Sequence, residues 1–165
     1  MMSEQAGPPD HPPVPYRFDV AHSTHDVAMT HPDLEPGSET DDIVTIAGRL
    51  MLRRDQGRIA FGNLQDSSGR IQLFATTALT EDFGGFTELS IGNWIAVTGI
   101  VMTTRRGELS VRVDEWTVLA HARRPFPDKW HGISDPEVRY RQRYVDLWVS
   151  EDSMNTLNPL HSEML

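Results

Sequence analysis

The chain has 165 residues and a net charge of −9, and its hydrophobic content of 38% is low for one compact core that would use the whole length. It contains no cysteine, which excludes disulfides, thiolate metal sites and a thiol nucleophile. No apolar run reaches the length of a membrane span, and the proline-rich start lacks the apolar core of a signal peptide, so we expect a cytoplasmic protein with no membrane partner.

The charge is distributed unevenly along the chain. Residues 43–149 hold 14 of the 15 basic and 12 of the 24 acidic residues, so this part carries +2 while the remainder carries −11. Its basic residues are arginines apart from Lys129, and arginine binds phosphates and base edges through paired hydrogen bonds better than lysine does. The middle of the chain is therefore compatible with a nucleic-acid partner, although a genome-wide bias toward arginine explains it equally well.

Residues 1–42 are predicted to form a flexible, acidic arm that is partly disordered, because they hold seven of the 11 prolines. Within this arm, residues 23–31 can form one short helix with Ser23 as its N-cap. Pro32 and then Pro36–Gly37 would end that helix.

From residue 43 onward the sequence is rich in β-formers and turn signals. Gly48 predicts a bulge or bend in the first strand, and a short helical insert over 78–90 is expected to be interrupted at Gly84 and Gly85. An order of three strands, helical insert and two strands is typical of a five-stranded oligonucleotide/oligosaccharide-binding (OB) barrel, an all-β fold, here over residues 43–121. An immunoglobulin-like sandwich needs more strands, and a βαβ fold needs longer helices. The five predicted strands are 43–54, 58–66, 69–76, 93–104 and 108–120.

The second and third strands can be paired across the turn at Ser67–Ser68. One face then carries small and apolar residues, and the other carries Phe61 opposite Phe74 and Asn63 opposite Gln72, provided that no bulge shifts the register. An outward aromatic ring beside amides suits a nucleotide base that stacks on the ring while an amide reads its edge. The alternative is that Phe61 packs beneath the N-terminal arm or against a partner protein.

Charged residues lie at two strand ends near this face. Arg53 and Arg54 end the first strand, and Glu108 opens the fifth, where alternation turns Glu108, Ser110 and Arg112 outward. A carboxylate can accept a hydrogen bond from a base, and an arginine can hold a base or a phosphate, although charges at strand ends are usually only solvated. The candidate nucleic-acid-binding residues are Arg53, Arg54, Phe61, Asn63, Gln72 and Glu108.

Three segments together resemble the N-terminal part of the bacterial lysyl-tRNA synthetases, which are class II enzymes: VTIAGRLMLRRDQGRIAFGNLQDSSGRIQLF, GNWIAVTGIVMTTRRGELSVRVDEWTVL and RPFPDKWHGISDPEVRYRQRYVDL. The resemblance implies an OB domain that binds the anticodon of tRNA, with a uridine-rich lysine anticodon as the target. It implies that Phe61 stacks on the central anticodon base, that Gln72 reads the edge of that base, and that Glu108 and Arg54, with Arg53 beside it, contact the anticodon.

In that family the segment RYRQRYVDL opens the catalytic domain. The resemblance therefore implies that residues 122–149 are a hinge toward a class II catalytic domain that is missing here. Residues 150–165 are predicted to be an irregular tail, because Pro159 would interrupt a helix there. We expect no catalytic residue, cofactor or metal in this truncated chain, with ATP and Mg²⁺ needed only by the missing domain, so that it is inactive alone as a lysine–tRNA ligase. A full-length synthetase is a further candidate partner, and the alternative function is a protein-interaction module that docks through the aromatic face and the hinge.

Overall fold

The computed structural model describes residues 14–123 and 136–149, so the predictions for 1–13, 124–135 and 150–165 lie outside the described residues. The chain divides into two compact units, one ending at Arg123 and one beginning at Arg124. No helix in the described ranges is long and apolar enough to cross a membrane. The first unit contains α1 (Thr24–Thr30), β1 (Glu39–Asp55), β2 (Ile59–Gln65), β3 (Arg70–Thr76), α2 (Phe83–Glu88), β4 (Trp94–Thr103) and β5 (Leu109–Ala120).

The second unit contributes two short helices, α3 (Pro136–Arg141) and α4 (Arg143–Val149). Asp146 of α4 is buried and accepts from Arg139 at 2.9 Å and from Arg143 at 2.6 Å. The predicted hinge therefore contains helical structure within residues 136–149.

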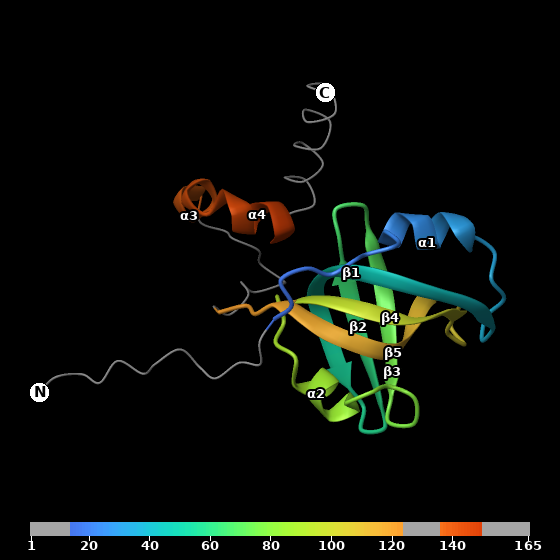
Figure 1. Cartoon of the computed structure of the whole chain (residues 1–165). Helices are drawn as coiled ribbons and strands as arrows, with labels where there is room; N and C mark the ends of the chain where they lie inside the picture. The colour runs from blue at the N-terminus through green and yellow to red at the C-terminus, as the bar shows by residue number, and fades with distance from the viewer. Residues whose placement is uncertain (1–13, 124–135, 150–165) are drawn as a thin grey trace, which may run out of the picture. The chain divides into compact units, whose positions relative to one another are not determined.

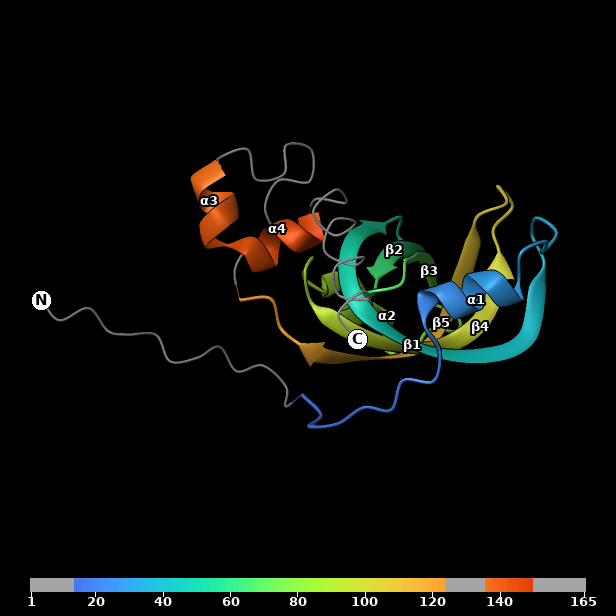
Figure 2. The same cartoon turned by 90° about the horizontal axis from the view of Figure 1, so that it is seen from above.

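The five strands close into a barrel in the order β1-β2-β3-β5-β4, which confirms the predicted all-β OB architecture (Figure 1). β1 begins at Glu39, four residues before the predicted start, and its 17 residues serve two partners. Its first part pairs with β4 and its last part pairs with β2, so one long strand belongs to both halves of the barrel. Seen from above, β1 curves around the side of the barrel (Figure 2).

Gly48 lies in the middle of β1 and permits a close approach between β1 and β2. A Cβ atom at this position would lie 2.5 Å from the carbonyl oxygen of Gln65, well inside van der Waals contact. The shift in register between β1 and β2 lies further along, between Leu50 and Leu52. The glycine therefore marks a tight backbone contact, and the bulge follows it by a few residues.

The predicted register of β2 and β3 is confirmed, with Phe61 opposite Phe74 and Asn63 opposite Gln72. The opposite faces of the two strands point into the barrel, where their apolar side chains are almost completely inaccessible. Burial of this set is the main source of stability for so small a domain. The buried residues of these two strands include Ala60, Leu64, Ile71, Leu73 and Ala75.

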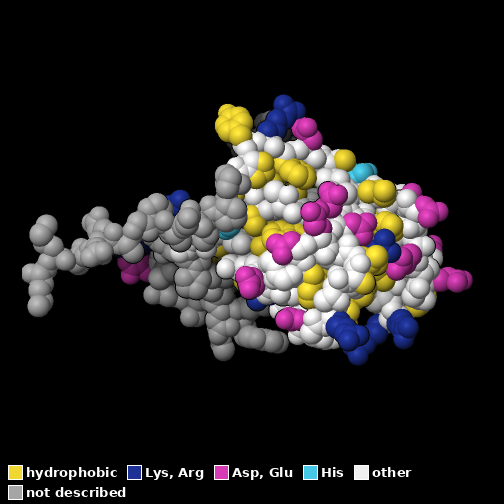
Figure 3. All heavy atoms as spheres, turned by 60° about the horizontal axis from the view of Figure 1, so that its bottom comes forward, with side chains coloured by type: hydrophobic (Ala, Val, Ile, Leu, Met, Phe, Trp, Pro, Cys, Tyr) yellow, Lys and Arg dark blue, Asp and Glu magenta, His cyan; other side chains and the backbone are white. Residues whose placement is uncertain are grey.

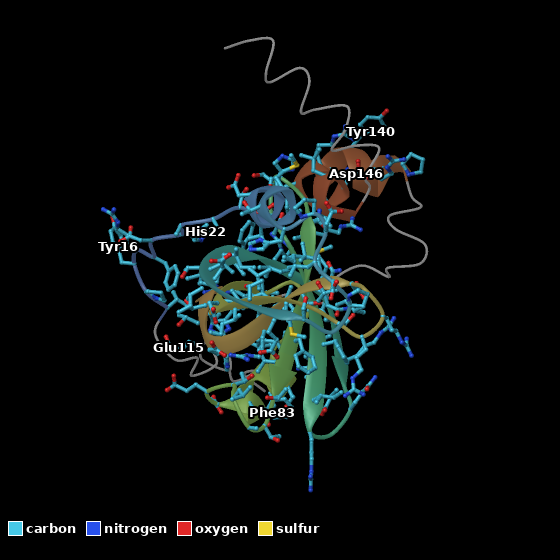
Figure 4. All side chains as sticks on the ribbon, turned by 90° about the vertical axis from the view of Figure 1, so that its right-hand side faces the viewer. Tyr16, His22, Phe83, Glu115, Tyr140 and Asp146 are labelled. Carbon is cyan, nitrogen blue, oxygen red and sulfur yellow. The ribbon has the colours of Figure 1, made fainter. Side chains whose placement is uncertain are left out.

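The helix α2 covers one end of the barrel, where Figure 4 labels Phe83. It includes both Gly84 and Gly85, so the predicted interruption at these residues was wrong. The side chain of Asp82 accepts a hydrogen bond from the Gly85 amide at 3.0 Å and starts the helix, while Phe86 is fully buried. A cap and one buried ring are thus enough to outweigh the low helix propensity of the two glycines.

The helix α1 begins where predicted, with Ser23 and Asp26 forming a reciprocal capping box. It is held against the turn between β2 and β3 by Asp66, whose carboxylate accepts from the amide and the hydroxyl of Thr24, each at 2.7 Å. Figure 1 shows α1 beside this turn. Further contacts fix the arm to the barrel, among them hydrogen bonds from the amides of Ala21 and His22 to the carbonyl oxygen of Thr45 and the buried side chain of Val27.

Candidate nucleic-acid interface

The outer face of β2 and β3, defined by Phe61, Asn63, Gln72 and Phe74, carries the candidate site. The two phenyl rings pack against each other with their centroids 5.4 Å apart and their planes tilted by 43°. Because of this contact both rings are half-buried, and Phe61 is less exposed than the sequence alone predicts. The pair forms a supported aromatic surface on which a flat ring can stack.

Arg54 and Arg53 lie on opposite sides of β1 because side chains alternate along a strand, and the register shift that precedes them places Arg54 on the side of Phe61. Arg54 pairs with Phe61, so its exposed side chain shares the outer face and makes no hydrogen bond to any described residue. Arg53 pairs with Gly62, and its guanidinium donates to the carbonyl oxygen of Leu89 at 2.7 Å. The structure thus brings Arg54 to the aromatic rings and directs Arg53 toward the segment that follows α2.

Gln72 is held by a neighbour from the strand that closes the barrel. β3 and β5 are parallel, with Gln72 opposite Ser110, and the Ser110 hydroxyl donates to Oε1 of Gln72 at 2.9 Å. Ser110 has no accessible surface, so it faces the predicted side of the strand but lies beneath its neighbours rather than in solvent. The carboxamide of Gln72 is therefore oriented by the protein before any ligand arrives.

Asn63 lies directly across from Gln72 on β2. Its side-chain oxygen is buried and has no hydrogen-bond partner among the described residues. A buried carbonyl oxygen without a partner is costly, typically by about 1–3 kcal/mol. The side-chain oxygen of Asn63 is therefore a hydrogen-bond acceptor on this face that no described residue satisfies.

Glu108 lies in the loop between β4 and β5, next to Gly107, whose φ of 82° allows the tight turn. Its carboxylate is exposed and makes no hydrogen bond or ion pair within the described chain, while its carbonyl oxygen lies 3.1 Å from Oγ of Ser110, within hydrogen-bonding distance. Glu108 therefore lies at the end of the face, two residues before Ser110, the residue that contacts Gln72.

Three further residues belong to this face although the candidate set omitted them. Phe74 supports Phe61, and Ser110 orients Gln72; the predicted register and the alternation of the fifth strand had already turned both outward. Arg112 lies opposite Phe74, but it is paired with Glu39 at 2.5 Å and with Asp114 at 3.4 Å, so acidic residues of the same chain neutralise its charge.

Acidic and basic side chains are distributed unevenly over the surface in view. Figure 3 shows acidic side chains scattered over one face of the molecule, while basic side chains gather along its lower edge. A negative total charge therefore coexists with a local concentration of arginine. In the described part of the chain, no group of three histidine, aspartate or glutamate residues could hold a metal ion.

Comparison with known proteins identifies the barrel. Residues 44–119 match the family of OB-fold nucleic acid binding domains of the tRNA anticodon type. The chain is 48% identical over 147 residues to a lysine–tRNA ligase of Synechococcus sp. (strain RCC307), a match that covers 87% of this chain and 29% of the relative. It is 45% identical over 156 residues to the lysine–tRNA ligase of Prochlorococcus marinus (strain MIT 9211), covering 87% of this chain and 31% of the relative.

The chain thus spans about 30% of the length of these relatives. Both the strand order and the match over residues 44–119 agree on the nature of the barrel. Residues 44–119 therefore match the OB-fold nucleic acid binding domains of the tRNA anticodon type, in a chain that resembles the N-terminal, anticodon-binding part of the lysine–tRNA ligases.

Proposed function

We propose that the outer face of β2 and β3 binds the anticodon loop of a tRNA with a uridine-rich, lysine-type anticodon. The observation that supports this most directly is the common face of Phe61 and Gln72, with the exposed Arg54 directly opposite Phe61. Single-stranded bases are bound in this way, by stacking on an aromatic ring and by hydrogen bonds to their edges.

Four residues on or beside the face have separate roles in this proposal. Phe61 stacks on the central anticodon base, and the carboxamide of Gln72 forms hydrogen bonds with the edge of that base. Arg54 holds a neighbouring phosphate or base, since a guanidinium is suited to both. Glu108 accepts hydrogen bonds from a second base at the end of the face.

Arg53 has a different role in the proposal. Its guanidinium is engaged by the carbonyl of Leu89, so it supports the barrel rather than the RNA.

We further propose that this chain by itself does not activate lysine and that it acts in the cytoplasm as an RNA-binding module. The support is the sequence, in which no Arg-x-Glu pair on a strand and no glycine-rich segment before a suitable arginine provides an ATP site. ATP and Mg²⁺ then have no role in what this chain does alone.

The test is the affinity of the full chain for an RNA stem-loop with a UUU anticodon. Phe61→Ala should weaken binding by about 1–3 kcal/mol, because a base loses the ring on which it stacks. Tyr16→Ala is the matched control, since Tyr16 is a fully exposed aromatic residue on the arm, labelled in Figure 4. Thermal unfolding of each variant separates lost binding from lost folding.

Equal affinity of Phe61→Ala and the parent chain for this RNA contradicts the proposal. A chain with no RNA affinity that forms a salt-insensitive complex with a synthetase supports the protein-docking alternative instead, because RNA binding weakens as salt rises.

A further inference from the structure

A buried serine hydroxyl lies beneath Gln72, the residue proposed to bind the edge of the central anticodon base. The Oγ of Ser110 is 2.9 Å from Oε1 of Gln72 and 3.1 Å from the carbonyl oxygen of Glu108, and the residue has no accessible surface. Both neighbours are acceptors, and a hydroxyl has one proton to donate. The choice of acceptor therefore determines which end of the Gln72 amide is free.

In the structure the serine donates to Oε1 of Gln72, so that oxygen is held toward β5. The NH₂ group of Gln72 makes no hydrogen bond within the described residues and remains available as a donor. Had the serine donated only to Glu108, the amide could turn over, donate its NH₂ to the serine and expose its oxygen. The two arrangements have nearly the same shape but offer opposite hydrogen-bonding groups to a ligand.

We propose that Ser110 is a positioning residue that makes Gln72 select a base with a keto oxygen over one with an amino group. This inference rests on the proposed function, because it concerns the base that Gln72 reads. The outward NH₂ donates to O4 of uracil, the position at which cytosine carries an amino group, and the second lone pair of Oε1 can accept from uracil N3–H. Cytosine instead carries an amino group at this position. This amino group and the NH₂ of Gln72 are both donors, so neither finds an acceptor in the other.

The experiment compares two stem-loops that differ only in the central anticodon base, uridine or cytidine. The parent chain should prefer uridine by roughly 5- to 150-fold, the range for one well-paired base edge. Ser110→Ala should reduce this ratio toward 1 while uridine binding changes less, because the freed amide can turn to suit either base. Ser110→Thr, which restores the hydroxyl, should recover the preference.

Ser67→Ala serves as the matched control, since Ser67 is exposed in the β2–β3 turn and its hydroxyl has no hydrogen bond to the residues described. Gln72→Glu provides a second variant should Ser110→Ala unfold. A carboxylate presents only acceptors, so the preference should reverse toward cytidine.

The outcomes separate the two proposals. Binding of neither stem-loop by the parent chain overturns the proposed function itself. Strong uridine preference in the parent chain and an unchanged ratio in Ser110→Ala leave the proposed function standing and overturn the role of Ser110. A parent chain that prefers cytidine also overturns it, because the amide then faces the other way.

Discussion

Arg53 and Arg54 are neighbours in the chain, yet their guanidinium groups lie in different surroundings. The single register shift between Leu50 and Leu52 decides which of them shares a face with Phe61. Without it, alternation would turn Arg53 outward and Arg54 toward the barrel. One extra residue in a strand thus determines which cation is available to a ligand.

This difference predicts opposite effects for two similar substitutions. Arg54→Gln should weaken binding of the anticodon stem-loop and reduce the slope of log K against log salt concentration by about 1 if the arginine contacts a phosphate. Arg53→Gln should leave RNA affinity nearly unchanged and lower the free energy of unfolding by about 1 kcal/mol, because the hydrogen bond to Leu89 is lost. Fluorescence titrations at several salt concentrations and urea unfolding measure the two effects, and interchanged results would contradict the assignment.

The sequence predicted the outward parity of Phe61 and Gln72 because their strands are joined by a short turn, which sets the register locally. It did not separate Arg53 from Arg54, because nothing in the sequence locates a bulge at Leu50–Leu52. It also did not predict the contact between Ser110 and Gln72. That contact depends on parallel pairing between residues 38 positions apart, and its register is not set by any local turn.

At the scale of the element, α1 shows how a short helix depends on a distant anchor. Ser23 and the prolines after the helix predicted its position, and the capping box confirms the start. Seven residues are too few to form a stable helix alone, so the buried side chain of Val27 and the anchor at Asp66 hold it against the barrel. That anchor lies 42 residues away in the sequence, beyond the reach of a local pattern.

The anchor makes the attachment of α1 sensitive to acid. Burial raises the pKa of the Asp66 carboxyl, but the hydrogen bonds from Thr24 and Ser68 together lower it by more than burial raises it. The pKa of Asp66 therefore lies below the usual value of 3.8. The ionised group therefore stabilises the folded chain above the unfolded pKa, and this contribution is lost as the pH falls below that value through the folded pKa.

We expect the amide of Thr24 to lose protection from hydrogen exchange as the pH falls below about 4, after correction for the intrinsic exchange rate. Asp66→Ala should cost about 1–3 kcal/mol of stability at pH 7, where the parent carboxylate is ionised and hydrogen-bonded. Asp41→Asn is the control, because Asp41 is exposed and its carboxylate has no hydrogen bond in the described part of the chain. The same acid dependence in Asp66→Asn as in the parent chain would contradict the role of Asp66.

At the scale of the whole molecule, the chain combines a near-neutral, arginine-rich middle with an acidic remainder. Its OB barrel matches the anticodon-type domains, while its length corresponds to about 30% of the lysine–tRNA ligases it resembles. The fold could be predicted in outline because strand periodicity and turn residues are local signals. The closure of the barrel by β3 and β5 was predicted only through the architecture as a whole.

The proposal that this chain does not activate lysine has a direct assay. Purified full chain with lysine, ATP and Mg²⁺ should give no lysine-dependent exchange between pyrophosphate and ATP, because its sequence provides no Arg-x-Glu pair on a strand and no glycine-rich segment for an ATP site. A full-length lysine–tRNA ligase tested in parallel shows that the assay works. Exchange that copurifies with the chain would show that it contains a catalytic site outside the barrel.

The pairing of β3 with β5 affects the order in which the candidate site is assembled as the chain folds. Gln72 is synthesised well before Ser110, and the two meet only when the last strand has joined the barrel. A chain still emerging from the ribosome can therefore present the aromatic rings before it can orient the amide. In our proposal, discrimination between bases is thus acquired last as the domain folds, and it is lost first when β5 separates from β3.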